Sequence, residues 1–182
     1  MSRSVRLTLL CEDKQHQAFA HRFFKALGWN LRDWRPIVAP AGSGAAEKFV
    51  REKFPVELAA LRTKGNEQVF LVVLIDGDAA GVDGRRAQLE NACREQGIEP
   101  PSEMERVLVC VPTWNIETWL AYLDGSDVDE MNSSYPRLTR ERACEPHAQA
   151  LATMCGSGRL RPPPPPSLKE ACIGYRRAVG DV

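Results

Sequence analysis

The chain has 182 residues, with 24 Lys and Arg balanced by 24 Asp and Glu. This length suits one domain of ordinary size with a sizeable core, and 43% apolar with 26% charged residues is typical of a soluble globular protein. The balanced charge excludes a global attraction to nucleic acid, so such a partner would need a local basic patch or a metal site. No segment resembles a signal peptide or a membrane span, which predicts a cytoplasmic protein.

The N-terminal segment predicts a buried strand that ends in acid. An apolar run over residues 5–10 precedes Glu12 and Asp13, and a helical pattern then continues to Gly28. A carboxylate beside a buried strand is costly to desolvate, although an acid at a helix start is also favoured by the helix dipole.

The next elements alternate between strand and helix. Residues 34–40 are apolar and bounded by prolines, which suits a short strand. A helix follows, with Ser43 as a candidate cap and with Pro55 expected to bend or split it. The nearly continuous apolar run Val69–Ile75 then predicts a strand that is covered on both faces, as in a parallel sheet.

The last part of the alternating series supplies a further helix, strand and helix. A helix that stops at Gly97 precedes an apolar strand over 107–111 and an amphipathic helix over 116–123. Four strands separated by helices predict a doubly wound, Rossmann-like parallel α/β sheet over residues 1–125. If the strand order is 2-1-3-4, the first and third strands are neighbours.

Residues 126–182 predict a helical extension packed on the same domain. Helical patterns cover about 137–155 and 167–178, separated by five prolines, Pro162–Pro166. We interpret this run as a rigid spacer in preference to a ligand for an SH3-type domain. Ser167 and Glu170 have the spacing of a capping box for the last helix.

The six cysteines show no paired spacing, and we expect them to be reduced in a cytoplasmic protein. Cys11 and Cys110 fall within apolar strand patterns and should fill the core. A zinc site formed by Cys144, His147 and Cys155, with Cys172 as fourth ligand, is a weaker alternative because the spacing matches no common zinc motif.

The strongest local motif is Asp76-Gly77-Asp78 at the end of the third strand. Two carboxylates this close repel each other unless a cation neutralises them, and Mg²⁺ or Mn²⁺ suits oxygen ligands. Glu12 ends the neighbouring strand, so three carboxylates are expected to converge where doubly wound sheets bind ligands. The alternative is that these acids cap the helices that follow.

These motifs resemble the TOPRIM domain of topoisomerases, bacterial primases and overcoming-lysogenization-defect (OLD) nucleases. The resemblance covers about residues 4–123. It consists of a Glu after the first strand and of an Asp-x-Asp motif with a following Gly after the third strand. It implies that Glu12 is a general acid/base, that Asp76 and Asp78 are Mg²⁺ ligands, and that the substrate is a nucleic-acid phosphodiester. Glu117, after the fourth strand, could add a metal contact or lie on a solvent-facing helix surface.

The segment VPTWNIETWLAYLDG also resembles small stand-alone TOPRIM-like proteins that neighbour ATPases in bacterial defence loci. This resemblance implies an ATPase partner and an antiviral role. The chain has no GxxxxGK[ST] motif and no zinc-ribbon primase module, which argues against a self-contained OLD protein or a primase. Lys14, Arg85 and Arg86 follow the acidic loops and are candidate phosphate contacts, with ordinary solvated helix faces as the alternative.

Three functional hypotheses follow. The first is a Mg²⁺-dependent nuclease that acts on DNA or RNA, either alone or with an ATPase partner in a bacterial defence or DNA-repair system. The second is a non-catalytic regulatory or interaction subunit that retains the fold and docks a partner through its proline-containing tail. The third, a phosphate-accepting receiver-like domain, is weakened because the lysine expected after a fifth strand is missing.

Overall fold

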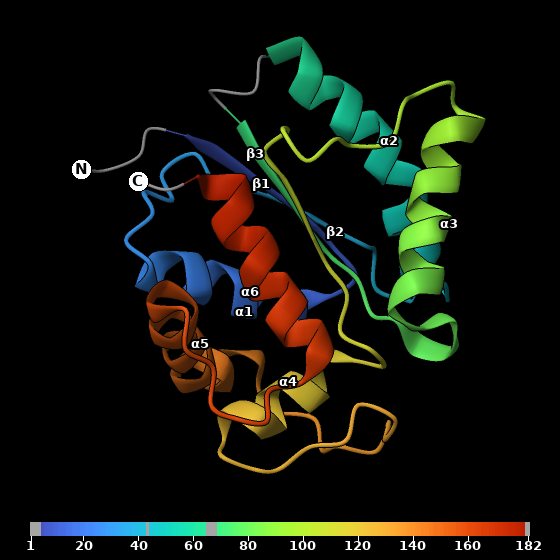
Figure 1. Cartoon of the computed structure of the whole chain (residues 1–182). Helices are drawn as coiled ribbons and strands as arrows, with labels where there is room; N and C mark the ends of the chain where they lie inside the picture. Colours follow the sequence, from blue (N-terminus) through green and yellow to red (C-terminus); the bar gives the residue numbers. More distant parts are fainter. Residues whose placement is uncertain (1–4, 43, 65–68, 181–182) are drawn as a thin grey trace.

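A four-stranded parallel sheet organises the protein, and helices cover both of its faces (Figure 1). The computed structural model describes residues 5–42, 44–64 and 69–180. The strand order is β2-β1-β3-β4, which confirms the predicted doubly wound order. The strands are β1 (Arg6–Cys11), β2 (Arg35–Val38), β3 (Val69–Leu74) and β4 (Val107–Cys110).

The register places the ends of β1 and β3 side by side. Cys11, the last residue of β1, pairs with Leu74, the last residue of β3. Cys11 also pairs with Val38 at the end of β2. Because all strands are parallel, the residues that follow β1 and β3 leave the sheet at the same edge. This edge carries Glu12 and the Asp76-Gly77-Asp78 motif.

The two faces of the sheet have separate apolar cores. Helices α2 (Ala46–Lys64) and α3 (Gly81–Glu95) cover the face that includes Leu10 and Val73. The other face, which includes Leu9 and Val72, contacts residues of α1 (Lys14–Ala26), α4 (Ile116–Leu123), α5 (Glu145–Ser157) and α6 (Pro166–Val179). Burial on both faces explains why the sequence of β3 is apolar throughout and does not alternate.

The helices after β1 and β3 lie on opposite faces, so the edge between these strands is a topological switch point. Helix α1 starts there because Asp13 is its N-cap, and the Asp13 carboxylate accepts a 2.8 Å hydrogen bond from the backbone N–H of His16. Of the two acids after β1, Asp13 therefore caps a helix, whereas Glu12 lies at the edge of the sheet where β1 and β3 end.

Helix α2 differs from its prediction. It runs from Ala46 to Lys64 as a single element with Pro55 inside it, so of the two expected outcomes, a bend or a split, the split does not occur. Pro55 is itself buried, and its neighbours Phe54 and Leu58 pack in the core with β3. This packing offsets the hydrogen bond that a proline removes from a helix. The proposed cap at Ser43 lies outside the described residues.

The C-terminal third packs on the same core as the sheet. Helix α6 lies beside β4, and its Tyr175 hydroxyl accepts a 3.0 Å hydrogen bond from the indole N–H of Trp29. The helix expected over 137–155 is shorter, because a 3-10 turn (Glu141–Cys144) precedes α5. Among the described residues, no helix combines the length and apolarity needed to cross a membrane.

The capping box predicted at Ser167 is wrong. Helix α6 already begins at Pro166, with Pro165 as its N-cap. The Ser167 hydroxyl instead accepts a 2.8 Å hydrogen bond from the Trp119 indole and contacts the Glu130 carboxylate. Proline is favoured at the first helical position because its missing N–H has no partner there anyway. Ser167 is thus free to join α4 to α6 across the core.

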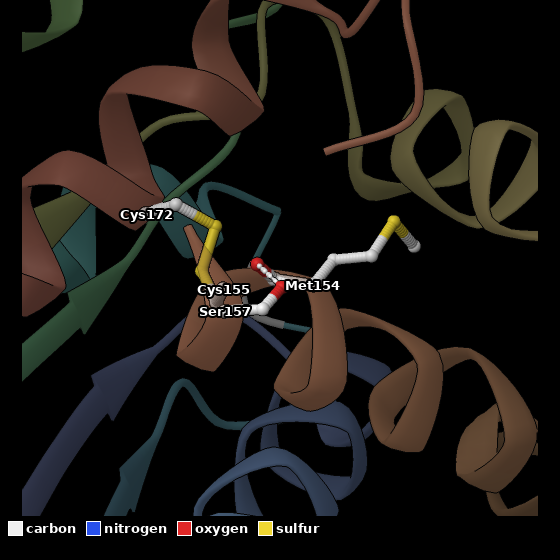
Figure 2. The surroundings of a disulfide bond; sticks show 4 residues. All are labelled: Met154, Cys155, Ser157 and Cys172. Atoms are coloured by element: carbon white, nitrogen blue, oxygen red, sulfur yellow. Dashed lines mark hydrogen bonds between the residues drawn. A yellow bond between two sulfur atoms is a disulfide. The ribbon is translucent and has the colours of Figure 1, made fainter. Parts of the chain in front are cut away.

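A disulfide joins α5 to α6 through Cys155 and Cys172 (Figure 2). The expectation that all six cysteines are reduced is therefore wrong for this pair. The proline segment folds the chain back so that the two Cα atoms are 5.4 Å apart, a distance that suits a disulfide. The bond also removes the zinc alternative, because two of its four candidate ligands are bonded to each other. The other cysteines of the described chain are free and buried.

Candidate functional site

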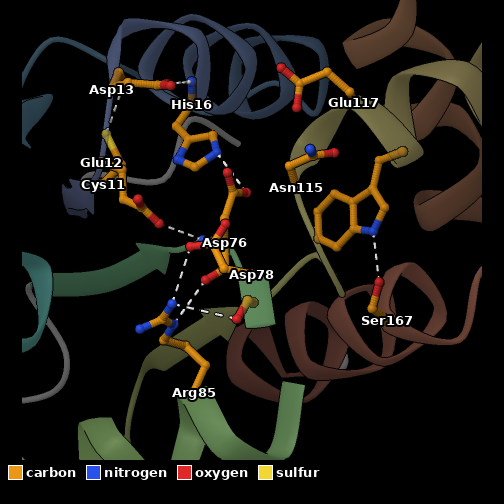
Figure 3. Close-up of polar contacts among 12 residues, drawn as sticks. Cys11, Glu12, Asp13, His16, Asp76, Asp78, Arg85, Asn115, Glu117 and Ser167 are labelled. Atoms are coloured by element: carbon orange, nitrogen blue, oxygen red, sulfur yellow. Dashed lines mark hydrogen bonds and ion pairs between the residues drawn. The ribbon is translucent and has the colours of Figure 1, made fainter. Parts of the chain in front are cut away.

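The acids at the ends of β1 and β3 meet at the sheet edge. The Glu12 carboxylate accepts a 2.6 Å hydrogen bond from the backbone N–H of Asp76 (Figure 3). This contact joins residues 64 positions apart in the sequence. The predicted convergence of Glu12 with the Asp-Gly-Asp motif is thus present in the structure, and it follows from the pairing of Cys11 with Leu74.

Asp76 has a buried histidine as its side-chain partner. His16 Nε2 lies 3.1 Å from Asp76 Oδ1, and the His16 side chain is completely buried. Burial lowers the pKa of His16, but the charge and hydrogen bond of Asp76, together with the charges of Asp13 and Glu12, raise the pKa to about 9. A protonated His16 therefore supplies positive charge to the cluster at neutral pH. Its position at the first turn of α1 is set by the Asp13 cap.

The turn after β3 is built around Gly77. The Gly77 N–H donates a 2.8 Å hydrogen bond to the Pro112 carbonyl, and the Asp78 N–H donates a 2.9 Å bond to the Trp114 carbonyl. A Cβ at Gly77 would lie 2.8 Å from the Pro112 oxygen and closer still to the Thr113 oxygen. Only glycine permits this approach of the turn to the segment between β4 and α4. Asp78 itself has a left-handed φ of 47°.

Arg85, from α3, braces this turn. Its guanidinium donates to the Asp76 carbonyl (2.9 Å), the Asp78 carboxylate (3.2 Å) and the Glu47 carboxylate (3.0 Å). The side chain is buried, with 4% of the residue exposed. Arg85 was predicted to contact phosphate, and it does lie at the acidic edge. Its donors, however, are directed at groups of the protein.

The cluster perturbs the acids within it. Burial raises the pKa of Glu12 to about 7, and the charge of Asp76 adds to the shift. Burial also raises the pKa of Asp78, again with a contribution from Asp76 that Arg85 partly offsets. Glu12 is therefore a carboxyl group that exchanges a proton near neutral pH, a property that suits a general acid or base.

A large cleft of about 1040 Å³ opens beside Glu12. Its walls come from the start of α1, the segment between β2 and α2, and residues 137–141. Lys14, one of the candidate phosphate contacts, lines this cleft, and so does Arg137. Arg137 Nε lies 3.2 Å from the carboxylate of Glu117, which is buried and has a pKa raised mainly by burial. Glu117 is thus not solvent-facing, and the charge of Asp76 also contributes to its raised pKa.

Arg86 is not part of this edge. Its guanidinium lies 3.4 Å from the Val109 carbonyl and 3.6 Å from the Glu170 carboxylate, beside β4 and α6. Residues next to each other on a helix point about 100° apart. Because Arg85 faces the acidic turn, Arg86 cannot do so. Of the three predicted phosphate contacts, the structure places Lys14 and Arg85 at the site and Arg86 elsewhere.

The donor chemistry of the site fits a hard divalent cation, since Glu12, Asp76 and Asp78 offer only carboxylate oxygens. Each carboxylate is already engaged, by the Asp76 amide, His16 and Arg85 respectively. Accordingly, no three His, Cys, Asp or Glu side chains in the described ranges are grouped so as to hold a metal ion. Each of these contacts uses one of the two oxygens of its carboxylate.

Two residues of this site were not anticipated as functional. Glu47 accepts hydrogen bonds from Arg85 and from Arg51, and Arg137 reaches Glu117 from a segment expected to be helical. The only sequence signal for Glu47 is its i,i+4 spacing to Arg51, which is common on solvated helix surfaces. Arg137 gives no signal, because its contact depends on the path of an irregular segment.

Searches against protein-family models, curated proteins and solved structures found no match to the chain. The fold and the site therefore define the protein as an α/β protein with a Rossmann-like parallel sheet and an acidic cluster at its switch point.

Proposed function

We propose that this chain is a Mg²⁺-dependent phosphodiester hydrolase of the TOPRIM kind, acting on DNA or RNA. The observation that carries the proposal is the 2.6 Å contact between Glu12 and the Asp76 amide, which brings acids from two strands to one point. Ligands of doubly wound sheets bind at such switch points. The order of the motifs, Glu after β1 and Asp-Gly-Asp after β3, matches that of the TOPRIM domain.

Asp76 and Asp78 would hold the metal ion, with Glu12 beside them. A bound Mg²⁺ would polarise the scissile phosphate and stabilise the charge that develops on the attacking and leaving oxygens. Glu12, with a pKa of about 7, can hold or release a proton at that point near neutral pH. His16 orients Asp76, and Arg85 fixes the backbone of the turn through the Asp76 carbonyl.

The cleft beside Glu12 supports a polymeric substrate. Its volume of about 1040 Å³ exceeds what one nucleotide needs, and Lys14 and Arg137 contribute positive charge to its walls. Glu12, Asp13, Glu117 and Glu141 also line the cleft, so a bound divalent cation would be needed to offset their repulsion of a phosphate chain.

The decisive experiment measures metal binding and cleavage together. Purified protein is titrated with Mn²⁺ and Mg²⁺ by calorimetry and incubated with single- and double-stranded DNA and RNA. We expect divalent-dependent cleavage that is lost in the Asp76→Asn/Asp78→Asn double variant. A control that replaces two exposed acids, Glu90→Gln/Glu103→Gln, should cleave like the wild type. Undiminished cleavage by the Asp76/Asp78 variant would refute the proposal.

A non-catalytic interaction subunit is the second candidate. The observation that favours it is that Arg85 and His16 already occupy two of the three carboxylates. A protein that binds neither metal but co-purifies with an ATPase would support this candidate over the hydrolase.

A further inference from the structure

A second cleft, of about 480 Å³, lies at the outer side of α5 and α6. It shares no lining residue with the cleft beside Glu12. Its walls come from the end of α5, the segment 158–164 and one face of α6. The charged residues that line it are all cations, namely Arg159, Lys169 and Arg176.

Helix α6 sorts its charges between its two sides. Lys169 and Arg176 are seven residues apart, two helical turns or about 10 Å, and both line the cleft. On the other side of the helix, Glu170 lies 3.6 Å from Arg86, and Arg177 lies 3.0 Å from Glu103. The side toward α3 is thus neutralised by ion pairs, whereas the side toward the cleft is not.

The side chains of the three cations of the cleft make no hydrogen bond or ion pair with any described residue. Arg161, in the same segment, shows the contrast, because it donates to two backbone carbonyls and lies 3.4 Å from the Asp127 carboxylate. Arg176 lies against Gly158, where a Cβ would collide with its guanidinium. A glycine at the end of α5 therefore leaves room for this side chain to face the cleft.

The remaining lining of the cleft is apolar and held in place. Met154, Leu160 and Ile173 contribute side chains, and the Cys155–Cys172 disulfide joins the two helices that form the walls (Figure 2). Pro162 and Pro164 stiffen the connecting segment. Little conformational entropy would be lost when a ligand binds between elements that are already fixed.

We propose that this cleft binds a nucleotide unit, either free or within a nucleic-acid strand. The phosphates would contact Arg159, Lys169 and Arg176, whose three unpaired charges suit a multiply charged anion. The base would pack on the apolar surface formed by Met154, Leu160 and Ile173. A volume of 480 Å³ is within the range of small-molecule sites and is sufficient for one nucleotide. The site does not require that the acidic edge be catalytic.

The test measures binding in EDTA, so that cleavage cannot contribute. A fluorescein-labelled oligo(dT) 12-mer is titrated with the full-length wild-type chain and followed by anisotropy, with ATP and inorganic phosphate as competitors. The variant Lys169→Gln/Arg176→Gln removes two cations of the cleft. The matched control Arg94→Gln/Arg177→Gln removes two exposed cations that are paired outside it.

We expect the Lys169/Arg176 variant to bind at least about tenfold more weakly, with a salt slope smaller by about 1.4, and the control to bind within about twofold of wild type. Ile173→Asp, which places an acid in the cleft, should weaken binding similarly. An inhibition constant for ATP below the dissociation constant of the oligonucleotide would indicate a free nucleotide as ligand, and the reverse order would indicate a strand. Both outcomes support the site.

Equal losses of oligonucleotide affinity in the Lys169/Arg176 variant and in the control would overturn the proposal. Inorganic phosphate that competes as strongly as ATP would overturn it too. Absence of wild-type binding to both the oligonucleotide and ATP would overturn it as well. Divalent-dependent cleavage tests the nuclease proposal and binding in EDTA tests this one, so failure of the nuclease proposal and failure of this one are distinguishable.

Discussion

Replacing Gly77 with alanine tests the geometry on which the acidic site depends. The new Cβ would lie 2.8 Å from the Pro112 carbonyl oxygen and closer to that of Thr113. Both atoms belong to the backbone, so no side chain can rotate away. The turn would have to move, which costs about 1–3 kcal/mol for overpacking. The movement would also strain the hydrogen bonds from Gly77 and Asp78 to Pro112 and Trp114, each worth about 1 kcal/mol.

We therefore expect Gly77→Ala to lose about 4 kcal/mol of folding stability, and a melting temperature lower by roughly 8–16 °C for a chain of this size. The assay is thermal unfolding followed by circular dichroism. Gly84→Ala is the matched control, because its Cβ would meet only the Ala80 side chain at 3.4 Å in α3. That variant should be more stable by up to about 1 kcal/mol. A Gly77→Ala protein that melts within 2 °C of wild type would refute the close approach.

Three further predictions concern charge and the disulfide. The pKa of Glu12 is raised from 4.5 to about 7, so between these pH values the folded state holds a proton that the unfolded state releases. Wild-type stability should therefore fall by up to about 3 kcal/mol as the pH rises from 4.5 to 7. In urea titrations over this pH range, Glu12→Gln should reduce that fall. Arg85→Gln leaves Asp78 without its cation and Glu47 with Arg51 alone, and it should cost about 3 kcal/mol, against less than 1 for Arg86→Gln. Reducing the Cys155–Cys172 bond, which spans 17 positions, should cost about 3 kcal/mol in the chain-entropy account and lower the melting temperature by roughly 6–12 °C.

Each of these predictions has a clear contrary result. A Glu12→Gln variant whose stability has the same pH dependence as wild type would show that Glu12 ionises normally. Equal stabilities of the Arg85 and Arg86 variants would mean that Arg85 does not brace the turn. An unchanged melting temperature after reduction, verified by counting free thiols, would contradict the role of the disulfide.

The strands were predictable because their burial on both faces requires continuous apolar runs. Val69–Leu74 is buried along its whole length, and this alone separates it from an alternating surface strand. The edge shared by Glu12 and Asp76 followed from the strand order, which connects two motifs far apart in the sequence. These features depend on regular periodicity, and the sequence carries it directly.

The features that escaped prediction depend on irregular segments. The disulfide forms because the segment 158–165 returns the chain to α5, and no spacing of cysteines encodes that path. Ser167 fits a cap by its spacing, yet its hydroxyl serves the Trp119 indole because Pro166 starts the helix. Arg85 was identified as a cation near the acids, but its role as a brace depends on burial, which a polar helix sequence does not reveal.

The position of α6 has a consequence for how the chain folds during synthesis. Leu168 and Tyr175, near the end of the sequence, share one core with Phe24, Trp29 and Phe70. The ribosome releases these three large side chains long before their partners in α6 exist. The part of this face that α6 covers consequently stays open to solvent until translation has passed residue 178, and a nascent chain stalled earlier would expose apolar surface that chaperones bind.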